Sequence, residues 1–257
     1  MFSQNSLGRG KRSAGGATTK VVGRAARILE RTLGIPRQKK QRALPIDMLI
    51  GTLLSQNTND RNSHRAYVAL RRLYPTWRKV AEAPVNAIAA AIKVGGMKNQ
   101  KSVRIKALLQ GLKKKNGSYN LNGIEKLSDD EVIETLTKFK GIGIKTASCV
   151  LLFSLRRNVF PVDTHVHRIC NRLGLVRTNS PDRTFEMMRP LIPDKKAYSF
   201  HTNLIRFGRS VCLARNPRCG RCPMFTMCRY TDKVKYAANN TGGPPRRNHK
   251  FMLLDEI

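Results

Sequence analysis

Apolar residues recur at helical spacing in one segment after another along this chain, and no other feature constrains its fold as strongly. Gly, Pro, Asn and Ser separate the segments, and the alternation typical of strands is missing. A first helix is predicted over 21–33, because the apolar spacing stops before Gly34. Further helices are predicted over 45–54, 59–74, 77–83, 85–94, 98–116, 129–137, 145–155, 164–173, 181–192 and 197–211. The pattern indicates an all-α fold.

Residues that favour helix N-termini stand where several of these segments begin. Pro45 suits a first turn, Ser128 precedes DDEVIE, and Asp163 precedes THVHRIC. No fixed repeat length relates the segments, so a solenoid is not expected. Residues 1–20 are expected to form a disordered basic arm, although their composition also resembles an organellar transit peptide. A mobile polar tail is expected over 229–257.

The charge balance points to a polyanionic partner. The chain of 257 residues has 49 Lys and Arg against 16 Asp and Glu, a formal net charge of +33. Nucleic acid is the usual partner for such an excess, and the binding should weaken steeply as salt rises. With 40% apolar residues the chain can still build a core. Its best apolar stretch, over 147–155, is too short to span a bilayer, so no membrane partner is expected.

Two glycines lie one residue apart in FKGIGIKTA, residues 139–147, between two predicted helices. Gly141 and Gly143 permit a tight turn with exposed amides, and the helix that follows adds the positive end of its dipole. Such a turn can hold a phosphate oxygen. A simple break between two helices is the alternative interpretation of the glycines.

Lys145 and Asp163 are candidate catalytic residues. Lys145 begins a predicted helix, where the helix dipole and neighbouring cations favour the free amine that attacks an electrophilic carbon. Asp163 is one of few carboxylates in a basic region and could take a proton or balance a developing positive charge. It could also cap a helix, and the two roles are compatible. His165 and His167 do not share a helix face, so they are expected in the core or behind the site.

Four of the six cysteines have a spacing typical of a metal centre. Cys212, Cys219, Cys222 and Cys228 lie within 17 residues. Four thiolates can hold zinc or an iron–sulfur cluster, and the spacing alone leaves both open. Two disulfides are a weaker alternative, because the array is dense and a reducing compartment is expected. The metal would cross-link a basic loop. This loop could bind a DNA backbone through Arg215, Arg218 and Arg221.

Four motifs in this order resemble the endonuclease III branch of the helix-hairpin-helix DNA glycosylase superfamily. They are LLSQNT at 53–58, GMKN at 96–99, FKGIGIKTA with VDTHVHRICNRLGL at 162–175, and the cysteine array. The resemblance runs from about Pro45 to Cys228. It implies two α-helical domains flanking a DNA-binding cleft. A six-helix barrel with the hairpin would span 44–157, and a domain of 21–43 and 158–228 would hold a [4Fe–4S] cluster on the four cysteines.

The same resemblance implies a bifunctional enzyme of base excision repair. Lys145 would attack C1′ of a damaged nucleotide, expel the base and form a Schiff base, after which the 3′ phosphate leaves by β-elimination. Asp163 would assist by polarising or deprotonating and by stabilising positive charge on the sugar. The substrates would be oxidised pyrimidines, and the partner would be double-stranded DNA with damaged bases or abasic sites. A monomer is expected, cytoplasmic and nucleoid-associated in a bacterium or archaeon, nuclear or organellar in a eukaryote.

The resemblance also implies which residues contact DNA. Gln56 and Met97 would fill the hole that a flipped base leaves in the duplex. The other expected contacts come from the hairpin and the cysteine loop: Lys140, Gly141, Gly143, Thr146, Arg215, Arg218 and Arg221. The hairpin has Phe139-Lys140 where the family usually has Leu-Pro, but its glycines and Lys145 remain, so its function is expected to survive.

Two other functions stay open on the sequence. A monofunctional glycosylase for mismatched or damaged bases activates water and needs no amine at position 145. The adenine-specific branch of that kind also carries a large domain after its cluster. A noncatalytic iron–sulfur DNA-binding protein would grip phosphate with the hairpin and use its cluster as a switch, and it would not need both Lys145 and Asp163.

Overall fold

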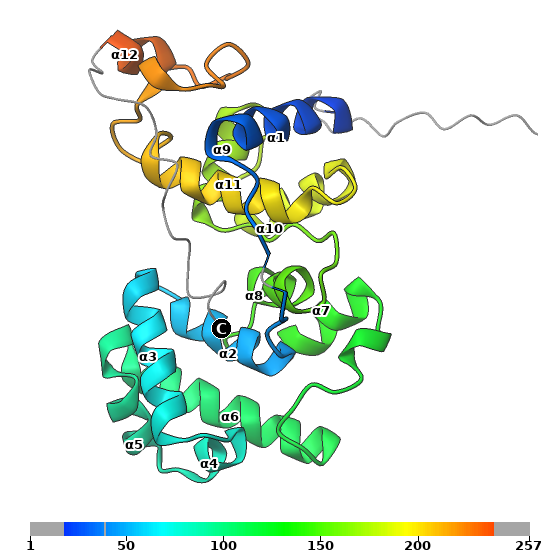
Figure 1. Ribbon diagram of the computed structural model, residues 1–257, viewed down its shortest axis with the longest axis vertical. Helices are drawn as coiled ribbons and strands as arrows, with labels where there is room; N and C mark the ends of the chain where they lie inside the picture. Colours follow the sequence, from blue (N-terminus) through cyan, green and yellow to red (C-terminus); the bar gives the residue numbers. More distant parts are fainter. Residues whose placement is uncertain (1–17, 39, 239–257) are drawn as a thin grey trace, which may run out of the picture. The chain divides into compact units, whose positions relative to one another are not determined.

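The computed structural model describes residues 18–38 and 40–238, which divide into two compact units (Figure 1). One unit combines 18–36 with 162–238, and the other comprises 37–38 and 40–161. Every regular element in these residues is helical, which confirms the all-α prediction. The α-helices are α1 (Thr19–Leu33), α2 (Pro45–Ser55), α3 (Asp60–Leu73), α4 (Trp77–Glu82), α5 (Val85–Ala91), α6 (Lys98–Asn116), α7 (Asp129–Thr137), α8 (Ile144–Cys149), α9 (Thr164–Arg172), α10 (Pro181–Met188), α11 (Ala197–Ser210) and α12 (Lys233–Ala238). Short helical turns are η1 (Lys93–Gly95), η2 (Ile124–Lys126), η3 (Val150–Ser154), η4 (Arg189–Leu191) and η5 (Cys219–Arg221).

Helix α2 is the centre of the unit formed by 40–161. It is buried from Ile46 to Leu54 and packs against α3, α6 and α8. A helix that is apolar on every side is stable only in such a core. Its one buried carboxylate, Asp47, accepts hydrogen bonds from the Tyr67 hydroxyl (2.9 Å) and from Trp77 Nε1 (3.1 Å). These two donors give the buried carboxyl group the hydrogen bonds without which its burial would be unfavourable.

Short polar side chains cap several helices, at Ser128 as predicted and at two positions not predicted, Asn59 and Ser180. Ser128 and Glu131 form a reciprocal capping box at α7, and Asn59 and Ser180 cap α3 and α10. Pro45 occupies the first turn of α2. Each cap satisfies an amide that the helix itself leaves without a partner.

In the other unit, α11 packs against α1 and α9, and α10 packs against α9. Segments far apart in the sequence, α1 and the start of α11, are joined there by a partly buried ion pair. The Glu30 carboxylate of α1 accepts from Lys196 Nζ (2.9 Å) and from the Ser199 hydroxyl (2.6 Å). Its side chain is only 10% exposed, so these contacts hold α1 against α11.

The unit boundaries lie at 36/37 and 161/162, whereas the sequence placed them at 43/44 and 157/158. The linker between α1 and α2 belongs to the unit that contains α2, because Arg156 Nη2 donates to the carbonyl of Lys40 (3.0 Å). Helix α1 begins at Thr19, inside the expected arm, and residues 1–17 lie outside the described residues.

The predicted start of the mobile tail, at residue 229, is too early. Residues 229–238 are structured: the amide of Arg229 donates to the carbonyl of Arg172 (2.9 Å), and Tyr230 stacks on Tyr236. Lys233 Nζ donates to the carbonyls of Phe225 (3.0 Å) and Cys228 (2.7 Å), so α12 is tied back to the cysteine loop. Residues 239–257 lie outside the described part of the chain.

Helices α5, α8 and α10 end sooner than the apolar pattern predicted. Helix α8 ends at Cys149 and continues as the single π-turn η3, a widened turn that often lies near functional sites. Helix α10 ends at Met188 and tightens into η4, where Pro190 has no amide to continue the α-helical pattern. Among the described residues no helix is both long and apolar enough to cross a membrane.

The substitution Glu30→Ala should lower the free energy of unfolding by about 1–3 kcal/mol, because it leaves Lys196 and Ser199 without their partner. The control is Glu134→Ala, which removes an exposed pair with Lys138 and should change it by less than about 1 kcal/mol. Denaturant unfolding followed by circular dichroism measures both. Equal losses would contradict the role given to Glu30.

Candidate functional site

The hairpin between α7 and α8 presents backbone and a lysine together. Gly141 has φ +89°, a left-handed conformation that favours glycine, and Ile142 anchors the turn at 5% exposure. Gly143 is the N-cap of α8, so Lys145 stands at the second helical position, half-buried. Lys140 is exposed beside the turn. The arrangement offers helix amides and an amine at one place, as an anion-binding and nucleophilic site requires.

Thr146, one of the expected DNA contacts of the hairpin, is buried in the structure. Thr146 is only 3% exposed, and its amide donates to the carbonyl of Gly143 (3.0 Å). It lies on the inner side of α8, next to the buried Ala147. Thr146 therefore packs the hairpin onto the core rather than facing solvent.

Gln56 is fastened to the hairpin. Its Nε2 donates to the carbonyl of Gly141 (2.9 Å), and its Oε1 accepts from Arg104 Nη1 (3.3 Å). The Arg104 side chain lies against Gly141, where a Cβ would meet Arg104 Cδ at 2.6 Å. The segment after α2, the helix α6 and the hairpin therefore meet at Arg104. This residue was not among those expected from the sequence, because its contact with Gln56 joins positions far apart in the chain.

Met97 lies at the tip of the loop before α6. It is 45% exposed, and its φ of +48° is uncommon for a residue with a bulky side chain. The Nδ2 of Asn57, itself at φ +52°, lies 3.6 Å from the Met97 sulfur. The structure thus brings the two expected hole-filling segments together, with Met97 at the surface rather than in the core.

Asp163 belongs to the other unit, where it is the N-cap of α9. Its Oδ1 accepts from the amide of Val166 (2.8 Å), and its side chain is half-buried. His165 Nδ1 lies 3.1 Å from Arg168 Nη2, and His167 Nδ1 lies 2.7 Å from the Thr184 hydroxyl. Burial lowers the pKa of both histidines, so their rings are neutral at pH 7. They support α9 from within the unit.

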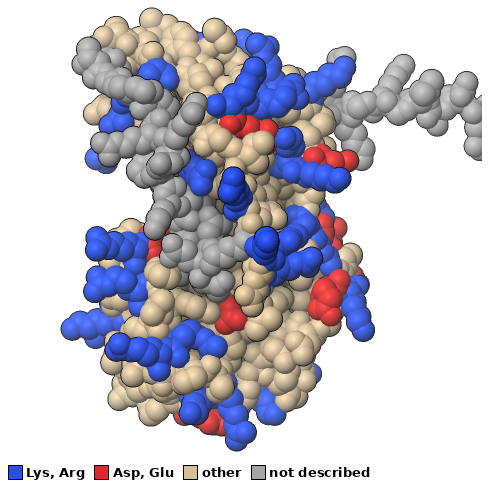
Figure 2. Space-filling model, viewed as in Figure 1, with Lys and Arg blue, Asp and Glu red and all other residues tan. Residues whose placement is uncertain are grey.

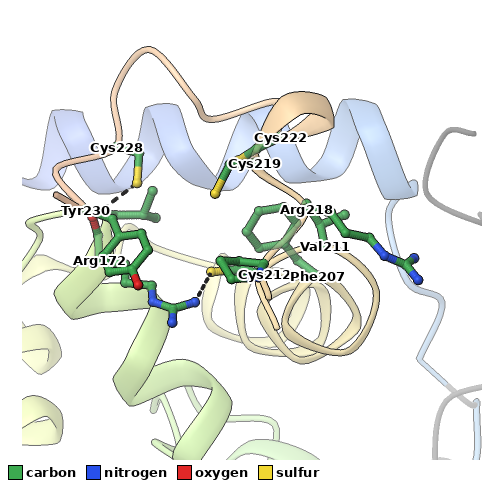
Figure 3. Close-up of a pocket in the computed structure, with 11 residues that line it drawn as sticks. Arg172, Phe207, Val211, Cys212, Arg218, Cys219, Cys222, Cys228 and Tyr230 are labelled. Carbon is green, nitrogen blue, oxygen red and sulfur yellow. Dashed lines mark hydrogen bonds between the residues drawn. The ribbon is translucent and has the colours of Figure 1, made fainter. Parts of the chain in front are cut away.

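The four clustered cysteines line one pocket (Figure 3). None of the six cysteines, all of which lie in the described residues, forms a disulfide. The sulfurs of Cys212, Cys219 and Cys228 turn toward the same space, which measures about 330 Å³ with its open mouth. Burial raises the pKa of Cys222 to about 12, and burial with the other thiols also raises the pKa of Cys219 and Cys228. Such thiols lose their protons when a cation binds among them.

Two arginines of α9 hold this loop in place. Arg172 donates to the Cys212 sulfur (3.5 Å) and to the carbonyls of Leu213 (2.6 Å) and Ala214 (3.0 Å). Arg168 Nη2 donates to the carbonyl of Cys212 (2.8 Å). The sequence analysis did not assign them, although their spacing of four residues on α9 places them on one face.

A protein-family model described as an HhH-GPD superfamily base excision DNA repair protein matches residues 50–194. The chain belongs to this superfamily. A second model, the iron–sulfur binding domain of endonuclease III, matches residues 212–228. Both matches confirm the resemblance to endonuclease III that the four motifs indicated.

Individual relatives of this HhH-GPD protein agree. Endonuclease III of Thermotoga maritima is 35% identical over 195 residues, covering 76% of this chain and 87% of that protein. A putative DNA glycosylase of Arabidopsis thaliana is 40% identical over 165 residues, which is 64% of this chain, and the chain spans only 56% of it. A solved non-covalent endonuclease III–DNA complex superposes with a TM-score of 0.73 and 25% identity, over 85% of this chain and 98% of that chain.

The surface of this HhH-GPD protein is rich in cations. Figure 2 shows Lys and Arg spread over the face in view, with few Asp and Glu between them. In the cysteine loop Arg215 and Arg218 are exposed, whereas Arg221 is half-buried. The guanidinium of Arg218 also donates to the carbonyl of Ser210 (3.1 Å), so it is partly held by the fold.

Gly141→Ala should lower the free energy of unfolding by about 1–3 kcal/mol, because it strains a left-handed backbone and displaces Arg104. Gly143→Ala is the matched control in the same turn. Gly143 has φ −104° and no atom within 4 Å of an added Cβ, so its change should stay below about 1 kcal/mol. Thermal unfolding of the two variants measures both changes. If Gly143→Ala lowered the free energy of unfolding as much as Gly141→Ala, the role given to Gly141 in this turn would be wrong.

Proposed function

We propose that this protein is a bifunctional DNA glycosylase and abasic-site lyase of base excision repair, acting on oxidised pyrimidines in double-stranded DNA. The observation that carries the proposal is the amine of Lys145, half-buried in the first turn of α8 directly after the glycine hairpin. A phosphate held by the hairpin amides would bring a deoxyribose close to that amine. The family membership supports repair of DNA bases as the context.

The proposed chemistry needs one amine to act twice. The neutral Nζ of Lys145 attacks C1′ of the nucleotide, and the N-glycosidic bond breaks so that its electron pair leaves with the base. Loss of a proton and opening of the sugar give a protonated Schiff base between Nζ and C1′. Removal of a proton from C2′ then drives β-elimination, in which the C3′–O3′ bond breaks and the 3′ phosphate leaves. Water finally hydrolyses the Schiff base and frees Lys145.

Asp163 is the proposed acid–base partner. A carboxylate can take the proton that the amine must lose and can stabilise positive charge on the sugar. Its hydrogen bond to Val166 uses Oδ1 and fixes the side chain at the start of α9. The helix cap and the catalytic role are therefore compatible in one residue, as the sequence suggested.

The DNA contacts of the proposal follow from exposure and charge. Met97 is the apolar side chain that would enter the duplex, and Gln56 would enter from the segment fixed to the hairpin. Lys140 and the hairpin glycines would hold the backbone, and exposed Arg215 and Arg218 would add phosphate contacts.

Four cysteines with this spacing can hold zinc or an iron–sulfur cluster. All four line one pocket, and residues 212–228 match the iron–sulfur binding domain of endonuclease III, which supports the cluster. We propose that Cys212, Cys219, Cys222 and Cys228 hold a [4Fe–4S] cluster, which supplies a cross-link that orders the loop.

Borohydride trapping tests the amine chemistry. Wild-type protein is incubated with duplexes that carry an abasic site, an oxidised thymine or no damage, and the reduced covalent adduct is measured on a denaturing gel. We expect adduct on the abasic and oxidised duplexes, with its complete loss in Lys145→Gln and a strong reduction in Asp163→Asn. Lys138→Gln, which removes an exposed lysine paired with Glu134, should keep the adduct.

The other outcomes are equally informative. Base release without any trapped adduct would replace the proposal with a monofunctional glycosylase. Binding to all three duplexes without base release or adduct would leave a noncatalytic DNA-binding protein. Adduct on the abasic duplex alone would retain the lyase step and reject oxidised thymine as a substrate.

The cluster assignment has its own test. The purified protein should be brown, with broad visible absorbance and about four iron and four acid-labile sulfide per chain. Cys222→Ser should lose most of this absorbance, whereas Cys149→Ala, at a buried thiol of α8, should keep it. A colourless, zinc-loaded and active protein would reject the cluster.

A further inference from the structure

Lys101, in the first turn of α6, has an unusual environment for a lysine. Its side chain is only 1% exposed, and the partners of its Nζ are two backbone carbonyls, of Leu54 (2.7 Å) and Gly95 (2.8 Å). Burial lowers the pKa of this amine to about 8, which means that folding desolvates the charged form at a cost. An apolar side chain of similar size would fill the same space without that cost.

The two carbonyls lie at the bases of two different loops. Leu54 is in the last turn of α2, two residues before Gln56. Gly95 ends η1, two residues before Met97. One ammonium group therefore bridges the segment that leaves α2 and the segment that enters α6.

The tips of the same loops are also joined. Asn57 Nδ2 lies 3.6 Å from the Met97 sulfur, and both residues have left-handed backbones, at φ +52° and +48°. Such backbones in residues other than glycine persist only where neighbouring contacts hold them. The hydrogen bonds of Lys101 provide such contacts at the base of each loop.

We propose that Lys101 is a positioning residue that joins these two loops into one element, so that Gln56 and Met97 enter a damaged duplex together. The inference rests on the proposed function, because it concerns how the hole left by a flipped nucleotide is filled. A lysine suits the task, because its ammonium carries several donors and can hold two carbonyls at once. Since it is buried, Lys101 acts through the loops rather than by touching DNA.

Lys101→Met tests the proposal, because it preserves length and removes the hydrogen bonds. Lys106→Met is the matched control on the same helix: Lys106 Nζ donates to one carbonyl, that of Ala83 (2.7 Å), between α4 and α5. Both variants lose a lysine–carbonyl contact of α6, but only Lys101 contacts the two loops. Thermal unfolding reports how far each change affects the fold.

Two DNA readouts separate positioning from stability. The first is the fluorescence of 2-aminopurine placed opposite an abasic site in a duplex, which rises when the helix is opened and the gap filled. The second is borohydride trapping on a single-stranded abasic oligonucleotide, which needs the Lys145 amine but no gap filling. We expect Lys101→Met to lower the rate of the fluorescence rise about tenfold and to leave single-strand trapping within about twofold of wild type. Lys106→Met should leave both unchanged.

Equal behaviour of the two variants in the fluorescence assay would overturn the proposal, as would a Lys101→Met defect that is equally large on single strands. Failure of wild type to trap any abasic DNA would instead reject the proposed function itself. If Lys101→Met does not fold, hydrogen exchange of the wild-type holoprotein tests the proposal instead. On binding of abasic duplex, the amides of 55–58 and those of 95–98 should become protected together and to the same degree. Protection of only one of the two segments would contradict the inference.

Discussion

Short helices leave many backbone carbonyls without partners at their ends, and in this protein lysine and arginine side chains donate hydrogen bonds to several of them. With 49 cationic side chains against 16 anionic ones, most cations cannot find a carboxylate. Several instead donate to carbonyls at the ends of helices and in loops. Examples are Lys113 to Gly117, Arg157 to Leu127 and Glu125, Arg172 to Leu213 and Ala214, and Lys233 to Phe225 and Cys228. Part of the net charge is therefore structural and is not free for a ligand.

The candidate site depends on the same kind of interaction, a hydrogen bond donated by a lysine or arginine side chain. Lys101 holds the loops that carry Gln56 and Met97, and Arg104 links Gln56 to the hairpin. In the other unit, Arg168 and Arg172 hold the carbonyls of the cysteine loop. The loops of the candidate site are thus fastened by one buried lysine and by half-buried arginines on helices α6 and α9. Exposed cations such as Lys140 and Arg215 are the ones proposed to contact phosphate.

Local features of the site could be predicted from sequence, and long-range ones could not. The capping box at Ser128, the cap at Asp163 and the turn glycines depend on residues a few positions apart, so their patterns are readable. The contact of Gln56 with Gly141 joins residues 85 positions apart, and no periodicity encodes it. The burial of Thr146 depends on which side of α8 faces α2, and the ordering of 229–238 depends on carbonyls of the cysteine loop. Each of these follows from tertiary packing rather than from local pattern.

The central claim is that a single amine, Lys145, carries the chemistry at the hairpin. The most direct test is to digest the borohydride-reduced protein–DNA adduct and to locate the sugar remnant by tandem mass spectrometry. The account predicts that the remnant lies on Lys145 alone, even though Lys138, Lys140 and Lys101 belong to the same unit. A remnant on one of those lysines, or spread over several exposed ones, would contradict it.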